Sequence, residues 1–391
     1  MKSLERIAVL TTTRADYGLL KALLERLRDD ASFDLRVIAT GTHLAPEFGL
    51  TVEEIEADGF SIDERVEIVL SSDTPVATAK AMALETIGIG EALARQRPDL
   101  LVVLGDRFEV LSAVQAAVVA RVPVGHIAGG ERTDGAFDDA IRHAVTKLSQ
   151  LHFVSAEPYR RRVVQLGEEP NRVFNVGAPG IEHLRCTPPL SRAELERQLG
   201  FPLKDRFLLV TYHPETLADR SPSESVRELL DALSSFTDLQ LLITYPNADT
   251  YGRHIIDQIE TFAAQYPGRA LVTPSLGQAR YVSALRGAAV VVGNSSSGII
   301  EAPAVPVPTV NIGARQAGRL RAPTIVDCKD TCDAIRAALD TALDPEFLRH
   351  VGDFSPPYGD GRTSEHIVSI LRSVDAAELV RKRFFDIPHD H

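Results

Sequence analysis

The chain has 391 residues, more than one compact core usually holds, and this length predicts two domains. Its 54 acidic and 42 basic residues give a formal net charge of −12. This balance argues against a protein that coats nucleic acid or an anionic membrane, because a phosphate backbone needs a basic footprint. An anionic ligand must instead be met by a local cluster of arginines. The three cysteines form no CxxC motif, and neither a secretory signal nor a membrane-spanning apolar run is present, so we expect a soluble, cytoplasmic protein.

Short β-branched runs alternate with amphipathic segments, the pattern of βαβ units on parallel sheets. In the first half, the predicted strands are 7–12, 35–39, 100–104, 124–127, 151–154 and 173–176. The predicted helices between them are 19–28, 76–95, 107–121 and 157–166. The rhythm breaks at 177–191, where Pro179, Pro188 and Pro189 indicate a linker.

The rhythm resumes in the second half, with predicted strands at 207–211, 239–244, 270–273, 290–293 and 308–312. Two doubly wound α/β domains facing a cleft are the simplest architecture for this order of elements. We expect an N-terminal domain over 1–178 and a C-terminal domain over 179–365. The helical pattern at 363–380 predicts a C-terminal helix in 366–391 that packs back on the first domain.

Polar residues that follow strands are the site candidates, because ligands bind beyond the carboxyl ends of the strands in such folds. Arg14 and Asp16 follow the first strand. Asp16 is expected to cap a helix beginning near Tyr17, and Arg14 is a candidate phosphate ligand. Asp106 and Arg107 follow the strand at 100–104 in the same way.

The densest polar group is HIAGGERTDGAFDDAIRH, at 126–143. The spacing of four from Asp138 to Arg142, and from Asp139 to His143, allows each pair to share a helix face. The two adjacent glycines are expected to let the backbone approach a ligand. Carboxylates and histidines grouped in this way suit general acid–base catalysis, although an ordinary helix start is also acidic. The polar members are His126, Glu131, Arg132, Asp134, Asp138, Asp139, Arg142 and His143.

The second half repeats the arrangement at its strand ends. The candidates there are His213, Asn247, Ser295, Ser296, Ser297, Glu301 and Arg315. Hydroxyls and free N–H groups at a turn that opens a helix can hold a diphosphate, and Glu301 one turn later can accept the ribose hydroxyls. A plain serine cap is the alternative. Neither a Walker A motif nor GxGxxG is present, and no HExxH or Cys/His cluster occurs, so we predict neither a cofactor nor a metal.

Together and in this order, the motifs resemble the hydrolysing UDP-N-acetylglucosamine 2-epimerases of bacterial sialic acid synthesis. The resemblance covers nearly the whole chain and is carried by RADYG, LGDRFE, GGERTDGAFDDAIRHAVTKLS, YHPET, NADT, GNSSSGIIE, NIGARQAGR and FFDIP. It implies a fold of the glycosyltransferase B type, with UDP bound chiefly by the second domain. It also implies release of UDP and N-acetylmannosamine from UDP-N-acetylglucosamine, and assembly into a dimer or tetramer.

The resemblance also assigns roles to residues. The implied UDP ligands are His213, Ser295, Ser296, Glu301 and Arg315, with Arg14 and Arg107 from the first domain. The implied acidic catalytic positions are Asp106, Glu131, Asp138 and Asp139, with Arg142 holding the substrate or its leaving phosphate. His213 is also a catalytic candidate. Relatives that invert the sugar without hydrolysis carry Glu where this chain has Ala128, which makes Glu131 the better acid–base candidate here.

This chemistry matches what carboxylates and arginines can do. A carboxylate removes the C2 proton while the C1–diphosphate bond breaks, and water then adds to the 2-acetamidoglucal intermediate. Asp106 and Glu131 are the first candidates for the acid–base steps, and Asp139 is the third. Four alternatives stay open: a hydrolysing epimerase of a 2,4-diacetamido-2,4,6-trideoxy nucleotide sugar (legionaminic acid route), a non-hydrolysing epimerase, a glycosyltransferase, and a non-catalytic nucleotide-sugar sensor.

Overall fold

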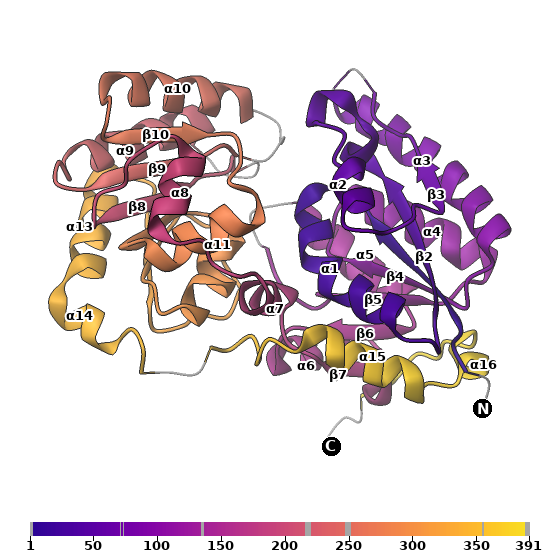
Figure 1. Cartoon of the computed structure of the whole chain (residues 1–391). Helices are drawn as coiled ribbons and strands as arrows, with labels where there is room; N and C mark the ends of the chain where they lie inside the picture. Colours follow the sequence, from indigo (N-terminus) through magenta and orange to yellow (C-terminus); the bar gives the residue numbers. More distant parts are fainter. Residues whose placement is uncertain are drawn as a thin grey trace. The chain divides into compact units, whose positions relative to one another are not determined.

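The chain forms two compact α/β units in a computed structural model (Figure 1). The structure describes residues 3–70, 72, 74–133, 137–215, 220–246, 252–353 and 356–387. The first unit comprises Met1–Glu131, Phe137–His183 and Tyr358–His391, and the second comprises Arg132–Ala136 and Leu184–Pro357. Within the described ranges, no helix is both long and apolar enough to cross a membrane.

The first unit is built on a seven-stranded sheet of order β3-β2-β1-β4-β5-β6-β7, in which every pair is parallel. Its strands are β1 (Arg6–Thr11), β2 (Asp34–Thr40), β3 (Glu64–Val66), β4 (Leu100–Leu104), β5 (Val124–Ile127), β6 (Leu151–Val154) and β7 (Val173–Asn175). Its helices are α1 (Arg14–Asp29), α2 (Val52–Ala57), α3 (Pro75–Gln96), α4 (Phe108–Ala120), α5 (Asp138–Leu148), α6 (Glu157–Gln165), α15 (Thr363–Ser373) and α16 (Ala376–Leu379). Helices on both faces of a parallel sheet explain why the central strand β4 is apolar along its whole length.

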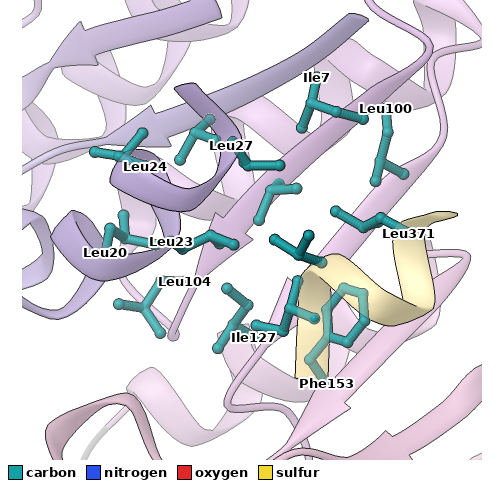
Figure 2. Packing of buried hydrophobic residues seen from close by; sticks show 14 of the residues in the cluster. Ile7, Leu20, Leu23, Leu24, Leu27, Leu100, Leu104, Ile127, Phe153 and Leu371 are labelled. Atoms are coloured by element: carbon teal, nitrogen blue, oxygen red, sulfur yellow. The ribbon is translucent and has the colours of Figure 1, made fainter. Parts of the chain in front are cut away.

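Successive side chains of a strand point to opposite faces, so the first unit has two core layers. Ile7 and Val9 of β1 pack on the side of α1 and α15, where Leu371 of α15 lies among the strand side chains (Figure 2). Ala8 and Leu10 pack on the other side, with apolar residues of α3 and α4. The carboxyl ends of β1, β4 and β5 lie side by side at one edge of this sheet, because the three strands are parallel neighbours.

The second unit is built on a six-stranded parallel sheet of order β10-β9-β8-β11-β12-β13. Its strands are β8 (Phe207–Thr211), β9 (Gln240–Thr244), β10 (Ala270–Thr273), β11 (Val290–Gly293), β12 (Thr309–Ile312) and β13 (Ile325–Cys328). Its helices are α8 (Arg192–Leu199), α9 (Pro222–Ser234), α10 (Gly252–Gln265), α11 (Gly277–Gly287), α12 (Ser296–Ile300), α13 (Cys332–Leu343) and α14 (Pro345–His350). Helices α9, α10 and α13 cover one face, and α8 and α11 cover the other.

The last part of the chain packs on the first unit. Arg26 of α1 donates to the hydroxyl of Ser364 at 2.8 Å, and Arg372 of α15 pairs with Asp30 at 2.6 Å. The chain joins this unit from Tyr358, whose carbonyl accepts a hydrogen bond from the Ala178 amide at 2.8 Å. This junction lies earlier in the chain than residue 365, where we expected the second domain to end.

Three further features differ from the sequence expectations. The expected linker at 177–191 contains helix α7 (Pro179–Cys186). Pro179 is its first residue, a position where proline is favoured because the missing N–H would have no partner within the helix. The single helix expected at 363–380 is divided, because Asp375 caps α16 through the Ala377 amide at 3.0 Å. Strands β3 and β13 were not predicted, since each is a short edge strand.

Candidate functional site

Three segments of the first unit gather polar residues at the carboxyl edge of its sheet. Asp106 lies two residues after the end of β4, and Glu131 lies in the loop that follows β5. Helix α5 carries Asp138, Asp139 and Arg142 on its first turns. Neighbouring parallel strands end at the same edge, so residues far apart in sequence meet there.

Arg142 is the centre of this group. It is only 2 % exposed, and its guanidinium forms ion pairs with the carboxylates of Asp106 and Asp139, the second at 3.3 Å. It also donates to the backbone carbonyl of Glu131 at 3.1 Å. A buried guanidinium is stable only where carboxylates and hydrogen-bond acceptors surround it. The structure thus brings together four of the predicted catalytic residues, Asp106, Glu131, Asp139 and Arg142. Within α5, the residue that pairs with Arg142 is Asp139.

The carboxylate of Glu131 is held separately from that ion-pair cluster. Ser155, the residue after β6, donates its hydroxyl to Glu131 Oε1 at 2.7 Å. Glu131 is 4 % exposed, so a carboxylate at this position needs such partners. The site therefore contains carboxylates in two different settings, one against the Arg142 guanidinium and the other against the Ser155 hydroxyl.

His126 of β5 connects helix α5 to the loop after β4. Its Nε2 lies 2.8 Å from the carbonyl oxygen of Gly105, and its Nδ1 lies 3.2 Å from the hydroxyl of Thr146 on α5. A carbonyl can only accept, so Nε2 carries the proton, and Nδ1 accepts from Thr146. Burial lowers the pKa of His126 to about 3, which keeps the ring neutral at physiological pH. His126 is therefore a structural link between α5 and the residue before Asp106.

His143 lies on α5 beside Asp139, with its Nε2 3.4 Å from the carboxylate, the spacing of four expected from the sequence. Burial lowers its pKa as well. Asp138 occupies the first turn of α5 and is half-buried.

The glycine pair after β5 serves packing. Gly130 has φ +77°, and a Cβ there would lie 2.5 Å from the carbonyl oxygen of Tyr159. A Cβ on Gly129 would lie 3.0 Å from both His126 Nδ1 and Thr146 Oγ1. Close packing against neighbouring protein atoms is therefore one reason for glycine at both positions, and the approach of a ligand to this backbone stays a prediction.

Each predicted phosphate-binding arginine of the first unit has a carboxylate partner. Arg14, the first residue of α1, pairs with Glu54 at 3.1 Å, and both side chains are more than a third exposed. Arg107 forms a two-pronged pair with buried Glu109, at 2.9 and 3.1 Å. These pairs orient the guanidinium groups. Replacing Glu54 by a phosphate as the partner of Arg14 would cost little free energy, because the Arg14–Glu54 pair is exposed.

Asp16 does not cap its helix as expected. Thr13 is the cap of α1, and Asp16 is the third helical residue of a capping box that reaches back to the Thr13 amide at 3.0 Å. Asp16 also accepts from the hydroxyls of Thr11 and Thr12, both at 2.7 Å. It is thus part of the framework of the β1 turn.

In the second unit, the ends of β8, β11 and β12 converge around Asn294. This buried side chain accepts from the His213 amide at 2.7 Å and donates to the His213 carbonyl at 2.9 Å. Its own carbonyl accepts from Arg315 Nη1 at 3.2 Å and from Gln316 at 2.9 Å. Burial, together with the charge of Arg315, lowers the pKa of His213 to about 3. His213 is therefore a neutral ring held beside Arg315.

The serine turn after β11 begins helix α12. Ser295 is its cap and accepts from the Ser297 amide at 3.4 Å, so the plain capping role considered for the serines is present. Gly293 has φ +133°, and a Cβ there would clash with the Thr211 carbonyl, so only glycine fits at this turn. Ser296 is the first residue of α12 and follows the cap directly.

Glu301 follows α12 and accepts from the Tyr281 hydroxyl at 3.2 Å. Burial raises the pKa of the Glu301 carboxyl. A carboxyl whose charge is disfavoured by burial gains from hydroxyl donors. Asn247, the remaining predicted ligand, lies outside the described residues.

Sequence reasoning missed several residues on which this geometry depends. Asn294 directly follows β11, so the rule that polar residues after strands matter could have identified it. Ser155 also follows a strand. Thr146 and Glu109 lie inside two of the quoted motifs, but only the tertiary structure places them beside His126 and Arg107.

Similar proteins place the whole chain in one group. It is 36 % identical over 98 % of its length, and all of the relative, to the GDP/UDP-N,N'-diacetylbacillosamine 2-epimerase (hydrolyzing) of Campylobacter jejuni. It is 35 % identical over 95 % of its length and 96 % of the relative to the UDP-N,N'-diacetylbacillosamine 2-epimerase (hydrolyzing) of Legionella pneumophila. The polysialic acid biosynthesis protein P7 of Escherichia coli is 34 % identical, over 98 % of each chain.

The fold agrees with that grouping. The crystal structure of the Neisseria meningitidis UDP-GlcNAc 2-epimerase bound to UDP-GlcNAc matches with a TM-score of 0.79, covering 94 % of this chain and all of the other at 17 % identity. This confirms the predicted arrangement of two parallel-sheet domains of the glycosyltransferase B type. The sequence profile of the UDP-N-acetylglucosamine 2-epimerase family matches residues 25–372, and the chain therefore belongs to the UDP-N-acetylglucosamine 2-epimerase family.

Proposed function

We propose that the protein is a hydrolysing 2-epimerase that releases UDP from a UDP-linked 2-acetamido sugar and inverts the sugar at C2. The observation that carries this proposal is the cluster in which Arg142 contacts Asp106, Asp139 and the Glu131 backbone. It combines proton-transfer groups with a buried cation, and both are needed when a C–H bond and a C–O bond break together.

In the proposed reaction, Asp106 or Glu131 removes the proton from C2 of the sugar. The C2–H electron pair forms the C1–C2 double bond, and the C1–oxygen bond breaks toward UDP. Arg142 stabilises the charge on the departing diphosphate or on the acidic groups that exchange protons with the sugar. Water then adds to C1, and a proton returns to C2 from the opposite face, giving the free manno sugar.

The UDP-binding role belongs in this proposal to His213, Ser295, Ser296, Ser297, Glu301 and Arg315, with Asn247, Arg14 and Arg107. Support comes from the turn at the end of β11, where the carbonyl of Asn294, the residue before the cap of α12, accepts a hydrogen bond from Arg315. Glu301 is available to ribose hydroxyls, because its burial favours hydroxyl donors as partners.

Two sugars compete as the substrate. UDP-N-acetylglucosamine, which leads to sialic-acid-type products, follows from the sequence motifs and from the similarity to the Escherichia coli polysialic acid protein. UDP-N,N'-diacetylbacillosamine, the 2,4-diacetamido-6-deoxy alternative, is favoured by the names of the Campylobacter jejuni and Legionella pneumophila relatives. We place the diacetamido sugar first, because these two relatives have the higher identities. A cytoplasmic location would give the enzyme access to either nucleotide sugar.

Proton NMR in deuterated water distinguishes these two substrates. With UDP-N,N'-diacetylbacillosamine, we expect free UDP and a free diacetamido manno sugar that carries deuterium at C2, because the C2 proton comes from solvent. Turnover only of UDP-N-acetylglucosamine, giving labelled N-acetylmannosamine, would establish the other substrate. A product that retains its nucleotide, or no turnover of either sugar without an acceptor, would refute the hydrolysing reaction.

We also propose that the protein is a homo-oligomer that associates through the first unit. Helices α3 and α4 pack side by side and expose apolar side chains, with Ile87 62 % and Val119 85 % exposed. Val76, Leu84 and Val118 extend the same exposed apolar set. An apolar surface of this kind is typical of an association site.

The double substitution Ile87→Asp and Val119→Asp is expected to convert the oligomer to monomer, with at least about a tenfold rise in the dissociation constant, because charges would be buried in the contact. Light scattering coupled to gel filtration measures the mass. Leu348→Asp, at an exposed apolar residue of α14, is the control and should leave the mass unchanged. A monomeric wild-type protein, or a double variant that still associates, would contradict the proposal.

A further inference from the structure

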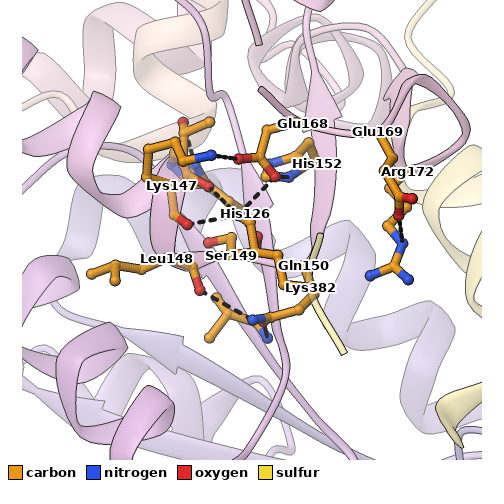
Figure 3. A network of polar contacts seen from close by, with 12 residues as sticks. His126, Lys147, Leu148, Ser149, Gln150, His152, Glu168, Glu169, Arg172 and Lys382 are labelled. Carbon is orange, nitrogen blue, oxygen red and sulfur yellow. Dashed lines mark hydrogen bonds and ion pairs between the residues drawn. The ribbon is translucent and has the colours of Figure 1, made fainter. Parts of the chain in front are cut away.

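The last turn of α5 is bound by a residue from the far end of the chain. Lys382 donates its Nζ to the carbonyl oxygens of Thr146 at 3.3 Å, of Lys147 at 2.6 Å, and of Ser149 (Figure 3). The final carbonyls of a helix have no partner within the helix, and the helix dipole favours a cation there. Lys382 therefore acts as a C-terminal cap for α5 supplied by a segment more than 230 residues away in sequence.

The Lys382 ammonium is balanced by a buried carboxylate. Glu168, 3 % exposed, pairs with Lys382 and with Lys147, both at 2.7 Å, and lies 2.9 Å from His152 Nε2. Burial alone would raise the pKa of Glu168, but the hydrogen bond from His152 and the nearby cations hold it at about 2. Burial lowers the pKa of Lys382 to about 8. Both charges are thus fixed in one geometry by surrounding partners.

Residues 382–385, which we call the C-terminal strap, make further contacts beside this ion pair. The Phe385 amide donates to the Gly167 carbonyl at 2.9 Å, and the Lys147 Nζ lies 4.7 Å from the centre of the Phe384 ring. The ring occupies the space where a Cβ on Gly167 would be. The strap is therefore docked by side-chain and backbone contacts together.

The helix end that the strap holds is connected to the catalytic cluster in two ways. Arg142 lies one turn before Thr146 on the same helix. The Thr146 hydroxyl also bonds His126, which bonds the Gly105 carbonyl beside Asp106. Both members of the Arg142–Asp106 ion pair are thus tied to the end of α5.

We propose that Lys382 is a positioning residue: by capping α5, the C-terminal strap fixes Arg142 against Asp106 in the geometry that turnover requires. This inference rests on the proposed function of the Arg142 cluster. Small displacements of catalytic groups are costly, since an error of about 1 Å can reduce turnover about 10²-fold. Lys382 touches no reacting atom, and its effect passes through α5.

The test compares Lys382→Met, Lys382→Arg and Arg383→Met. The last is the matched control, since Arg383 is the exposed neighbour in the same strap. We measure kcat and KM, UDP affinity by calorimetry, and hydrogen exchange of the α5 amides. For Lys382→Met, we expect kcat to fall at least about tenfold and the amides at 144–149 to exchange faster, with UDP affinity within about twofold of wild type. Lys382→Arg should restore both, and Arg383→Met should match wild type.

Lys382→Met leaves the charge of Glu168 underbalanced, so the double variant Lys382→Met with Glu168→Gln provides a folded alternative that lacks both charges. It should show the same faster exchange in α5 and the same loss of kcat. Wild-type exchange and kcat in either folded variant would overturn the inference. Hydrogen exchange needs no substrate, so an inactive wild-type protein whose α5 still loosens without Lys382 would refute the proposed reaction and leave the capping role standing.

Discussion

Replacing Asp106 with asparagine is expected to lower kcat by about 10²-fold or more while UDP affinity stays close to the wild-type value. The amide keeps the size of the carboxylate but cannot take a proton from C2. It also removes the negative charge opposite Arg142. Glu131→Gln should have an effect of similar size, since the amide keeps a hydrogen-bond acceptor for Ser155 but loses the basic group.

Single-turnover rates of UDP release, together with calorimetric UDP binding, measure these two variants. Asp34→Asn is the matched control: Asp34 begins β2 and pairs with Arg6 and Arg36, away from the carboxyl edge of the sheet. It should alter stability slightly and turnover not at all. Near-wild-type turnover in both Asp106→Asn and Glu131→Gln would remove these carboxylates from the acid–base role.

The charge state of two buried histidines, His213 and His126, bears on the acid–base role proposed for the carboxylates. His213 stood among the catalytic candidates, but burial and the charge of Arg315 bring its pKa to about 3. At neutral pH, its ring can therefore hold a ligand as a hydrogen-bond partner but cannot start the reaction as a charged acid. His126 is neutral for the same reason. We therefore propose a carboxylic acid, rather than a charged imidazole, for the step that returns a proton to C2.

The fold was readable from the sequence wherever burial imposed a strong pattern. The strands β4, β5, β6, β8 and β11 begin and end where the sequence predicted, because strands buried on both faces are largely apolar runs bounded by polar turns. The bounds of β10, a half-buried edge strand, also match. Strand β3 escaped prediction because Glu64 and Arg65 dilute its apolar signal. Helix α7 was hidden by the prolines around it, one of which simply occupies its first position.

The site was readable only in part, because sequence spacing gives neighbours within one element and not across elements. The spacing of four between Asp139 and His143 is present, whereas Arg142 pairs with Asp139, three residues away, and with Asp106 in the loop after β4. The binding of Arg107 by Glu109 and of Glu131 by Ser155 depends on which side chains are buried together. No motif encodes the approach of Lys382 to the end of α5.

Arg142→Met is the second change for which a large effect is expected. The methionine fills much of the volume of the arginine stem but removes every contact with Asp106, Asp139 and the Glu131 carbonyl. We expect kcat to fall about 10³-fold, the loss typical when a preorganised donor to developing charge is removed. The free energy of unfolding should fall by about 3 kcal/mol, since removing one partner of a buried ion pair leaves the other charges unbalanced.

Arg142→Lys distinguishes charge from geometry at the same position. Lysine keeps the positive charge but cannot contact two carboxylates and a carbonyl with one planar group, so it should restore most of the stability while kcat stays at least about tenfold below wild type. Urea unfolding at pH 7 and UDP-release kinetics measure the two quantities separately. If folded Arg142→Met turned over within tenfold of the wild-type rate, Arg142 would have only a structural role. Recovery of stability without recovery of kcat in Arg142→Lys would instead locate its function in the fork of the guanidinium, which no point charge reproduces.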